Sequence, residues 1–298
     1  MIQLEDIERK LEELPLLPDV VVRLLQLKPD DELFFDKVLE LAQEDPTFAL
    51  QVIRLGNSAS SAPISQIKSL QEAVARVGAD AIAGLITSMA VLRVFVPVSP
   101  GEKELWVHSI QVAVIAKKLA SSLSAFKIDP NQAYLCGLLH DIGRFVMFDK
   151  AATELIRVEA ENWQTPEELI EAELSICGFD HSKLGGLVCK KWALPEIVRR
   201  VVAYHHMYSD KKHNAIESHD GHLSNLLKMA QVADRLSMLL IHKPEILSCP
   251  ENVLTLALAE CNHPCLVSLN LSTGELKNIA EYAVDETARL VSGLGLQT

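Results

Sequence analysis

Hydrophobic residues recur at helical spacing along most of the chain, and alternation of period two is hard to find. Aromatic residues make up only 5% of the sequence, which also gives little support for strands. Helix starts are clear at several points. Ser69 with Glu72 and Thr165 with Glu168 have the spacing of capping boxes, and Asp129 precedes a proline suited to a first helical turn. The pattern therefore predicts an all-α protein.

Breaks in this pattern predict how the chain is divided. The expected helices of the first part cover residues 3–13, 20–27, 34–42, 47–55, 70–77 and 79–95. Pro97, Pro100 and Gly101 then interrupt the pattern. We expect a two-lobed protein with an N-terminal helical lobe over residues 1–100, a second helical lobe over residues 101–245, and a C-terminal helical extension over residues 246–298 packed on the core.

Composition narrows the classes of partner. The formal net charge is −12, which opposes direct binding to nucleic acid because a phosphate backbone requires clustered Lys and Arg. One basic stretch, residues 183–213, is predicted to be a solvated helix surface. The most apolar segment, residues 83–98, is too short for a membrane span and carries Arg93.

The N-terminus has no basic region followed by an apolar stretch, so no signal peptide is predicted. The six cysteines are therefore expected to be reduced thiols in a cytoplasmic protein.

Several ionisable residues interrupt otherwise apolar helix faces. These residues are His108, His140, Asp141, His181, His205 and Asp234, with His206 adjacent and Glu104 one turn before His108. A single histidine of this kind is more often a satisfied core residue than a ligand, but a set spread over five helices is harder to explain in that way. Buried carboxylates need compensating cations, and these faces carry no Lys or Arg. A metal ion that neutralises Asp141 and Asp234 is therefore predicted.

The spacing of these residues suits shared ions. Glu104 and His108 are four residues apart and are neighbours on one helix face. His140-Asp141 and His205-His206 are adjacent pairs, whose side chains diverge by about 100° in a helix and can address two ions, or one ion and a substrate phosphate. A mixed set of imidazoles and carboxylates favours Fe or Mn, with Zn or Mg as alternatives.

These motifs resemble known families. His108, His140-Asp141 and Asp234 resemble the H…HD…D signature of the HD superfamily of metal-dependent phosphohydrolases. Residues 139–143, together with Glu104, His181, His205 and His206, are similar to its HD-GYP branch, whose members hydrolyse cyclic di-GMP at a site with two or three metal ions. Residues 14–18, 44–46, 55–58 and 69–74 resemble a third group, the HDOD family of signalling output modules. That resemblance runs from about residue 13 to about residue 210.

The chain differs from typical HDOD domains in one respect and from HD-GYP proteins in two. Many HDOD domains have lost the metal ligands, whereas this sequence keeps them. Unlike HD-GYP proteins, it follows His206 with residues 207–211, Met-Tyr-Ser-Asp-Lys, and has Arg144 where that branch usually has lysine.

The resemblance implies a site for two divalent metal ions. The implied ligands are Glu104, His108, His140, Asp141, His181, His205, His206 and Asp234. Asp141 would bridge the two ions, and it forms the implied catalytic pair with Arg144, which would contact a phosphate. A surface salt bridge is the alternative role for Arg144.

Three functions are compatible with these features. The first is a regulatory HDOD module that acts in signal transduction through protein partners or a small nucleotide ligand. The second is a phosphohydrolase or phosphodiesterase, in which two metal ions activate a water for attack on a phosphate ester. The third is a diiron oxygenase. The HDOD-like N-terminal motifs favour the first, and the complete ligand set favours the second.

Overall fold

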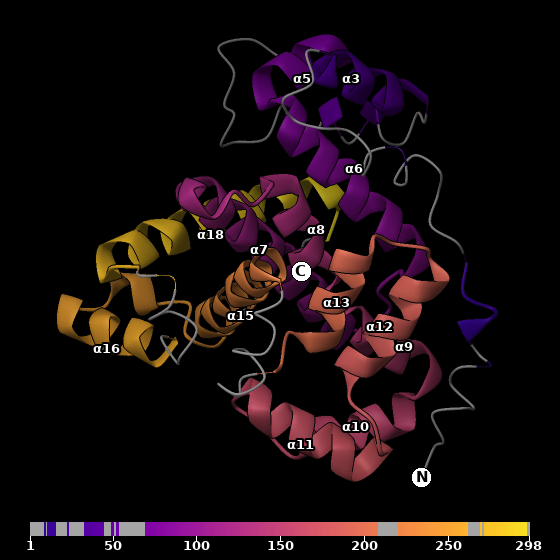
Figure 1. Cartoon of the computed structure of the whole chain (residues 1–298), viewed down its shortest axis with the longest axis vertical. Coiled ribbons are helices and arrows are strands. Elements are labelled where there is room, and N and C mark those ends of the chain that lie inside the picture. Colours follow the sequence, from indigo (N-terminus) through magenta and orange to yellow (C-terminus); the bar gives the residue numbers. More distant parts are fainter. Residues whose placement is uncertain are drawn as a thin grey trace. The chain divides into compact units, whose positions relative to one another are not determined.

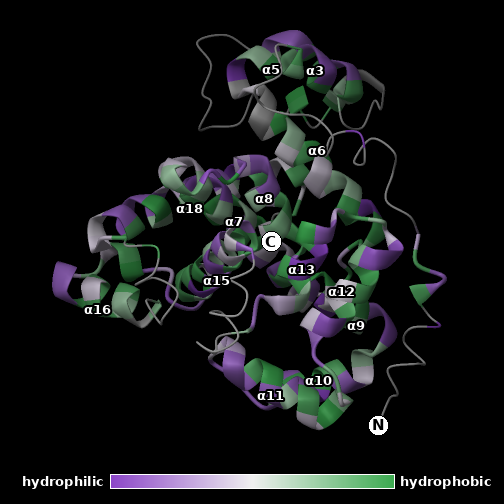
Figure 2. Cartoon of the chain, in the orientation of Figure 1, coloured by the Kyte–Doolittle hydropathy of each residue, from purple (hydrophilic) through white to green (hydrophobic). Residues whose placement is uncertain are grey.

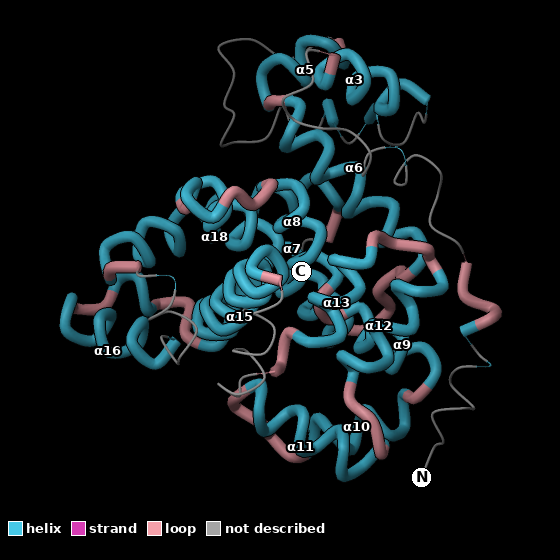
Figure 3. The backbone as a smooth tube through the Cα atoms, viewed as in Figure 1, coloured by secondary structure: helices cyan, strands magenta, loops and turns pink. Residues whose placement is uncertain are grey.

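The computed structural model describes residues 9, 11–15, 23, 33–44, 49–50, 52–53, 69–207, 220–261, 269 and 271–296. Over these residues the chain forms helices joined by turns and loops, without strands (Figures 1 and 3). The all-α prediction is confirmed. The predicted helices over residues 3–13, 20–27 and 47–55 lie largely outside the described residues.

The described helices follow one another along the chain with short connections. They are α3 (Phe34–Glu44), α5 (Leu70–Val77), α6 (Ala79–Val94), α7 (Pro100–Ser122), α8 (Pro130–Leu139), α9 (Ile142–Lys150), α10 (Ala152–Ala160), α11 (Pro166–Cys177), α12 (His181–Lys191), α13 (Glu196–Tyr204), α15 (Gly221–His242), α16 (Glu251–Cys261) and α18 (Thr273–Leu294), with 3-10 turns η2 (Ser124–Phe126) and η3 (Ile246–Ser248). None of them is both long enough and apolar enough to be a membrane span, as far as the described residues extend.

The chain divides into two compact units. The first contains Met1–Leu16 and Gln111–Glu281, and the second contains Leu17–Ile110 and Tyr282–Thr298. Helices α7 and α18 each contribute residues to both units. The two units are described separately below.

In the second unit, α3, α5 and α6 pack against one another through apolar side chains. Val38, Val74, Ile82 and Leu85 are fully buried there. Helix α5 begins where the sequence predicts, because the Ser69 hydroxyl accepts a hydrogen bond from a backbone amide of the first turn. Helix α6 is almost entirely apolar, as expected for a helix buried on most sides.

The first unit is a set of helices in which α12 packs against both α9 and α13, and α15 packs against α8 and α13. Figure 2 shows hydrophobic and hydrophilic residues interspersed along α10 and α11, as amphipathic helices require. Helix α11 begins at a complete capping box, in which Thr165 and Glu168 exchange hydrogen bonds. Helices α8 and α12 begin at simpler caps, in which the side chains of Asp129 and Asp180 each accept a hydrogen bond from a backbone amide of the first turn.

Glycines allow close approach of helices in the first unit. A Cβ atom at Gly143 on α9 would lie 1.9 Å from the carbonyl oxygen of His181, the first residue of α12. A Cβ atom at Gly137 on α8 would lie 2.8 Å from the Cα atom of Ala113 on α7. Only glycine fits at such distances, so the glycine after the His140-Asp141 pair sets the separation of α9 from α12.

Candidate metal centre

His140 and Asp141 lie at the junction of two helices. Helix α8 ends at Leu139, the two residues form a turn, and α9 starts at Ile142. Helix α8 begins at Pro130, where the sequence predicts a helix start. The exposed fractions of His140 and Asp141 are only 1% and 4%, so both polar side chains depend on partners inside the protein.

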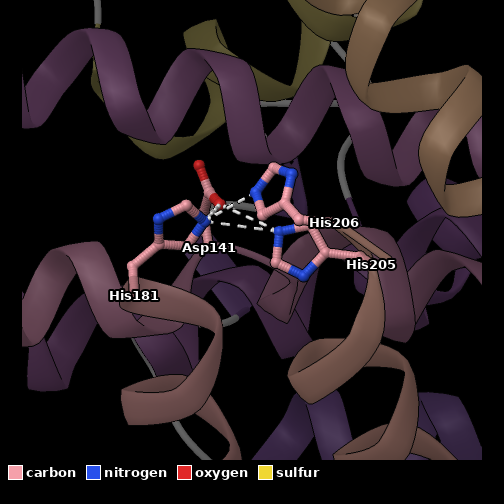
Figure 4. A group of neighbouring side chains, drawn as sticks. All are labelled: Asp141, His181, His205 and His206. Carbon is pink, nitrogen blue, oxygen red and sulfur yellow. Dashed lines mark hydrogen bonds and ion pairs between the residues drawn. The ribbon is translucent and has the colours of Figure 1, made fainter. Parts of the chain in front are cut away.

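Asp141 is surrounded by three histidines from α12 and from the turn after α13. Asp141, His181, His205 and His206 each offer a ligand atom, and these atoms all lie within 4.8 Å of one another. We call these four residues the Asp141 cluster. In Figure 4, His205 and His206 approach Asp141 from one side and His181 approaches from the other. Six predicted ligands lie in the first unit, and four of them meet in this cluster.

The distances within the cluster are those of ligands around a common point. The Asp141 Oδ1 atom lies 2.9 Å from Nε2 of His181 and 3.5 Å from Nε2 of His205. The Nε2 atoms of His181 and His206 are 2.9 Å apart. His181 and His205 therefore direct Nε2 toward the Asp141 carboxylate, and His206 directs Nε2 toward that of His181.

The other two predicted ligands of this unit lie next to the cluster. The Nε2 atom of His140 lies 3.5 Å from Oδ1 of Asp141 and 3.8 Å from Oδ1 of Asp234. Asp234 comes from α15 and is 3% exposed. His140 is thus between two buried carboxylates.

Glu104 and His108 belong to the part of α7 that is assigned to the second unit. Glu104 is exposed and His108 is buried. Their role as ligands stays a prediction.

Three histidines are held by a bond at the ring nitrogen that faces away from the carboxylates. The Nδ1 atom of His140 lies 2.8 Å from the carbonyl oxygen of Gly137, and that of His205 lies 2.7 Å from the carbonyl oxygen of Val202. The Nδ1 atom of His181 lies 2.7 Å from a carboxylate oxygen of Glu173. Each acceptor holds a proton on Nδ1 and directs Nε2 inward. Metal-binding histidines are held in this way.

Glu173 is a site residue that sequence reasoning missed. It lies on α11, is fully buried, and accepts hydrogen bonds from both Nδ1 and the backbone amide of His181. A signal was present in the sequence, because Leu169, Ala172 and Ile176 form an apolar stripe on this helix and Glu173 interrupts it.

Arg144 is buried, with 7% of its surface exposed. Its guanidinium pairs with Glu159 on α10, lies 5.1 Å from the centre of the Trp163 ring, and has Nε 4.0 Å from a carboxylate oxygen of Glu173. The positive charge of Arg144 therefore compensates the negative charges of Glu159 and of the buried Glu173. A phosphate contact by Arg144 stays a prediction.

The family follows from the comparison of the sequence with known protein families. The model of the HDOD domain matches residues 14–208, about two thirds of the chain. The chain belongs to the HDOD family. The resemblance of the N-terminal motifs to this family is therefore confirmed, over nearly the same residues.

Other proteins share the HDOD fold with this chain. A candidate phosphohydrolase from Shewanella amazonensis SB2B superposes with a TM-score of 0.70 at 22% identity, and an HDOD domain protein of unknown function from Geobacter sulfurreducens with 0.69 at 23% identity. Each alignment covers 97% of both chains. At such identities the likeness concerns the fold.

The chain matches only part of a longer curated relative. An uncharacterized protein from Treponema pallidum (strain Nichols) is 25% identical over 201 residues. The alignment covers 66% of this chain and 38% of the relative.

Burial and neighbouring charges determine the protonation states of the candidate ligands. Burial opposes the charge of Asp141, but the neighbouring His140 and His181 outweigh it and lower the pKa of the carboxyl well below its usual range. Burial also opposes the charge of His181, yet the carboxylates of Glu173 and Asp141 raise its pKa to about 10. Burial and the neighbouring His205 and His181 lower the pKa of His206 well below its usual value. Asp141 is therefore charged and His206 neutral at neutral pH.

The donor set fits a divalent transition metal. A carboxylate and three imidazoles, with Nε2 directed inward, are ligands that Fe, Mn and Zn accept in proteins. In the metal-free protein, the proton on His181 supplies the positive charge beside Asp141 and Glu173. A divalent cation would supply more positive charge at the same place, so the residues present fit such an ion.

Proposed function

We propose that this HDOD protein is a metal-binding regulatory module of signal transduction, in which the Asp141 cluster holds a divalent transition metal ion, Fe or Mn. The observation that carries the proposal is the Nδ1 bond of His140, His181 and His205, which directs each Nε2 atom inward. Metal-binding histidines are characteristically held at the second ring nitrogen in this way, and a purely apolar core does not require such bonds.

The protein contributes a preorganised set of ligands. Asp141 supplies the charged carboxylate, and His181, His205 and His206 supply imidazole nitrogens. The second ion predicted from sequence would use His140 and Asp234, with Asp141 as the bridge. A bound ion would supply a Lewis acid that polarises a phosphate or a water molecule.

A signalling role is consistent with the family and with one structural relative. A candidate signal transduction protein from Marinobacter aquaeolei VT8 has the same fold, with a TM-score of 0.67 at 20% identity, and the alignment covers 99% of this chain and 61% of that one. We propose that the present chain also acts through a protein partner.

Metal analysis of the purified protein tests the proposal. We expect at least one Fe or Mn ion per chain in the wild type and loss of most of it in Asp141→Asn, because this change removes the charged ligand and keeps the shape. Asp149→Asn on α9 is the control, since its side chain is about half exposed. A wild type without metal, or an Asp141→Asn variant with full occupancy, would contradict the proposal.

A metal-dependent phosphohydrolase is the second candidate function. The observation that favours it is a groove of about 450 Å³ that is lined by His206 and by basic side chains. Such a groove could hold an anionic substrate beside the cluster. Cleavage of bis(p-nitrophenyl) phosphate or cyclic di-GMP by metal-loaded protein, abolished in Asp141→Asn, would support it. Metal-loaded protein that cleaves neither substrate would count against it.

A further inference from the structure

A basic groove lies along α12 and α13, within the first unit. Its volume is about 450 Å³, and its lining includes Lys183, Gly186 and Lys190 of α12, Arg199 and Tyr204 of α13, and His206. We call it the basic groove. His206 belongs both to the groove lining and to the Asp141 cluster. The groove therefore begins at the candidate metal centre.

The basic stretch of the sequence separates into distinct roles in the structure. The Nζ atom of Lys191 donates to the carbonyl oxygen of Glu12, and Arg200 pairs with Asp220. Lys211, Lys212 and His213 lie outside the described residues. The basic side chains that remain for the groove are those of Lys183, Lys190 and Arg199. Lys183 and Lys190 are exposed, as predicted for a solvated helix surface.

Two of these cations are available for a ligand. Lys183 and Lys190 are exposed, and neither forms an ion pair with any residue in the described part of the chain. Arg199 is already paired with Glu196. The Asp180 carboxylate, which also lines the groove, accepts from the Lys183 backbone amide and the Ser182 hydroxyl and caps α12.

The two lysines are separated along the helix. Their positions are seven residues apart, which corresponds to about 10 Å of helix axis. Lys183 is in the first turn of α12, two residues after His181, whereas Lys190 is in its last turn. Between them, Gly186 faces Ala203 of α13, so that small side chains form this part of the groove. One phosphate group is too small to contact both ends.

We propose that the basic groove binds an extended small ligand with two phosphate groups, such as a linear dinucleotide, with one phosphate at the metal centre near Lys183 and the other at Lys190. The ring of Tyr204, which is 38% exposed, offers a surface on which a base can stack between the two. This inference rests on the proposed metal site and names the ligand class of that site.

Calorimetric titration of metal-loaded protein tests the inference with two ligands. The dinucleotide pApA carries two separated phosphates, and AMP carries one. We expect pApA to bind more tightly than AMP. Lys190→Glu should weaken pApA binding about tenfold or more, because a charge-assisted contact is replaced by repulsion. AMP affinity and metal content should stay unchanged in this variant. Lys277→Glu on α18 makes the same charge change at an exposed lysine outside the groove and should change neither affinity.

The outcomes separate the groove from the metal site. Equal pApA affinity in the wild type and Lys190→Glu, or absence of pApA binding to metal-loaded protein, would overturn the inference. If Lys277→Glu weakened pApA binding as much as Lys190→Glu does, the effect would come from net charge alone, and the inference would again be overturned. Metal analysis of the same samples tests the proposed function independently. Binding of pApA that depends on Lys190 in a sample without metal would support the groove and contradict the metal site.

Discussion

One buried polar side chain from each unit illustrates a different way of satisfying such a group. In the second unit, the hydroxyl of Thr87 donates to the carbonyl oxygen of Ala83 in the same helix, so the bond forms with α6 alone. In the first unit, His181 of α12 is bonded to Glu173 of α11 and lies 2.9 Å from Asp141 at the start of α9. A polar group satisfied within its own helix needs no tertiary structure, whereas one satisfied between helices depends on it. The chemistry of the protein is concentrated where the bonds cross between helices.

The largest expected effect comes from breaking the approach of α9 to α12. Gly143→Ala would place a Cβ atom 1.9 Å from the carbonyl oxygen of His181, so the two helices must move apart. We expect a loss of about 3 kcal/mol or more of unfolding free energy, at the upper end of overpacking effects. Urea titration followed by circular dichroism measures it.

Gly274→Ala is the matched control for this change. No atom lies within 4 Å of a Cβ atom at that position, and alanine is the better helix former by up to about 1 kcal/mol. Similar unfolding free energies of Gly143→Ala and Gly274→Ala would mean that the close approach of α9 to α12 does not require glycine at position 143.

A smaller effect is expected from the support of His181. Glu173→Gln keeps the shape of the side chain but removes the negative charge that holds the Nδ1–H bond. Loss of such a supporting partner lowers metal affinity by about 10-fold to 100-fold. Titration of Mn²⁺ against a competing chelator measures the affinity. Glu171→Gln, an exposed change on the same helix, should leave it unaltered. Equal affinities in the two variants would contradict a positioning role for Glu173.

A change of one pH unit is expected to have the smallest of these effects on the free energy of unfolding. Carboxylates raise the pKa of His181 from 6.5 to about 10 in the metal-free fold. The stabilisation by this charged imidazole is therefore complete below the unfolded-state pKa and is lost as the pH rises toward about 10, by about 1.4 kcal/mol per pH unit.

Wild type and His181→Gln, compared in chelator, isolate this group. The difference in their unfolding free energies should shrink as the pH rises. In metal-loaded protein an ion takes the place of the proton, so this slope should disappear. A constant difference from about pH 7 to about pH 9 without metal would refute the assigned charge of His181.

Local signals in the sequence predict much of the fold. Helix α5 covers the predicted residues 70–77, because Ser69 caps its first turn, and the almost entirely apolar α6 ends one residue before its predicted end. Helices α9 and α10 were not predicted. Asp141 and Ala151 precede them, and neither makes a side-chain capping bond. Without a cap there was no local signal to recognise.

The sequence predicts the candidate ligands but not the hydrogen bonds between helices that hold them in place. Histidines and carboxylates on apolar faces indicated His181, His205 and Asp234 as inward-facing groups, and these residues are buried. The bond between Glu173 and His181 joins two helices, so it depends on tertiary packing that no spacing reveals. For the same reason, the pairing of Arg144 with Glu159 could not be read from the sequence.

The supports of the three anchored histidines differ in how far along the chain they reach. His140 and His205 each bond to a carbonyl oxygen three residues earlier, within the same stretch of backbone. His181 instead relies on a residue eight positions earlier, on a separate helix. A designer who transplanted this centre into another helical scaffold could move the first two histidines as single helical turns. The third would function only if α11 were transplanted with it.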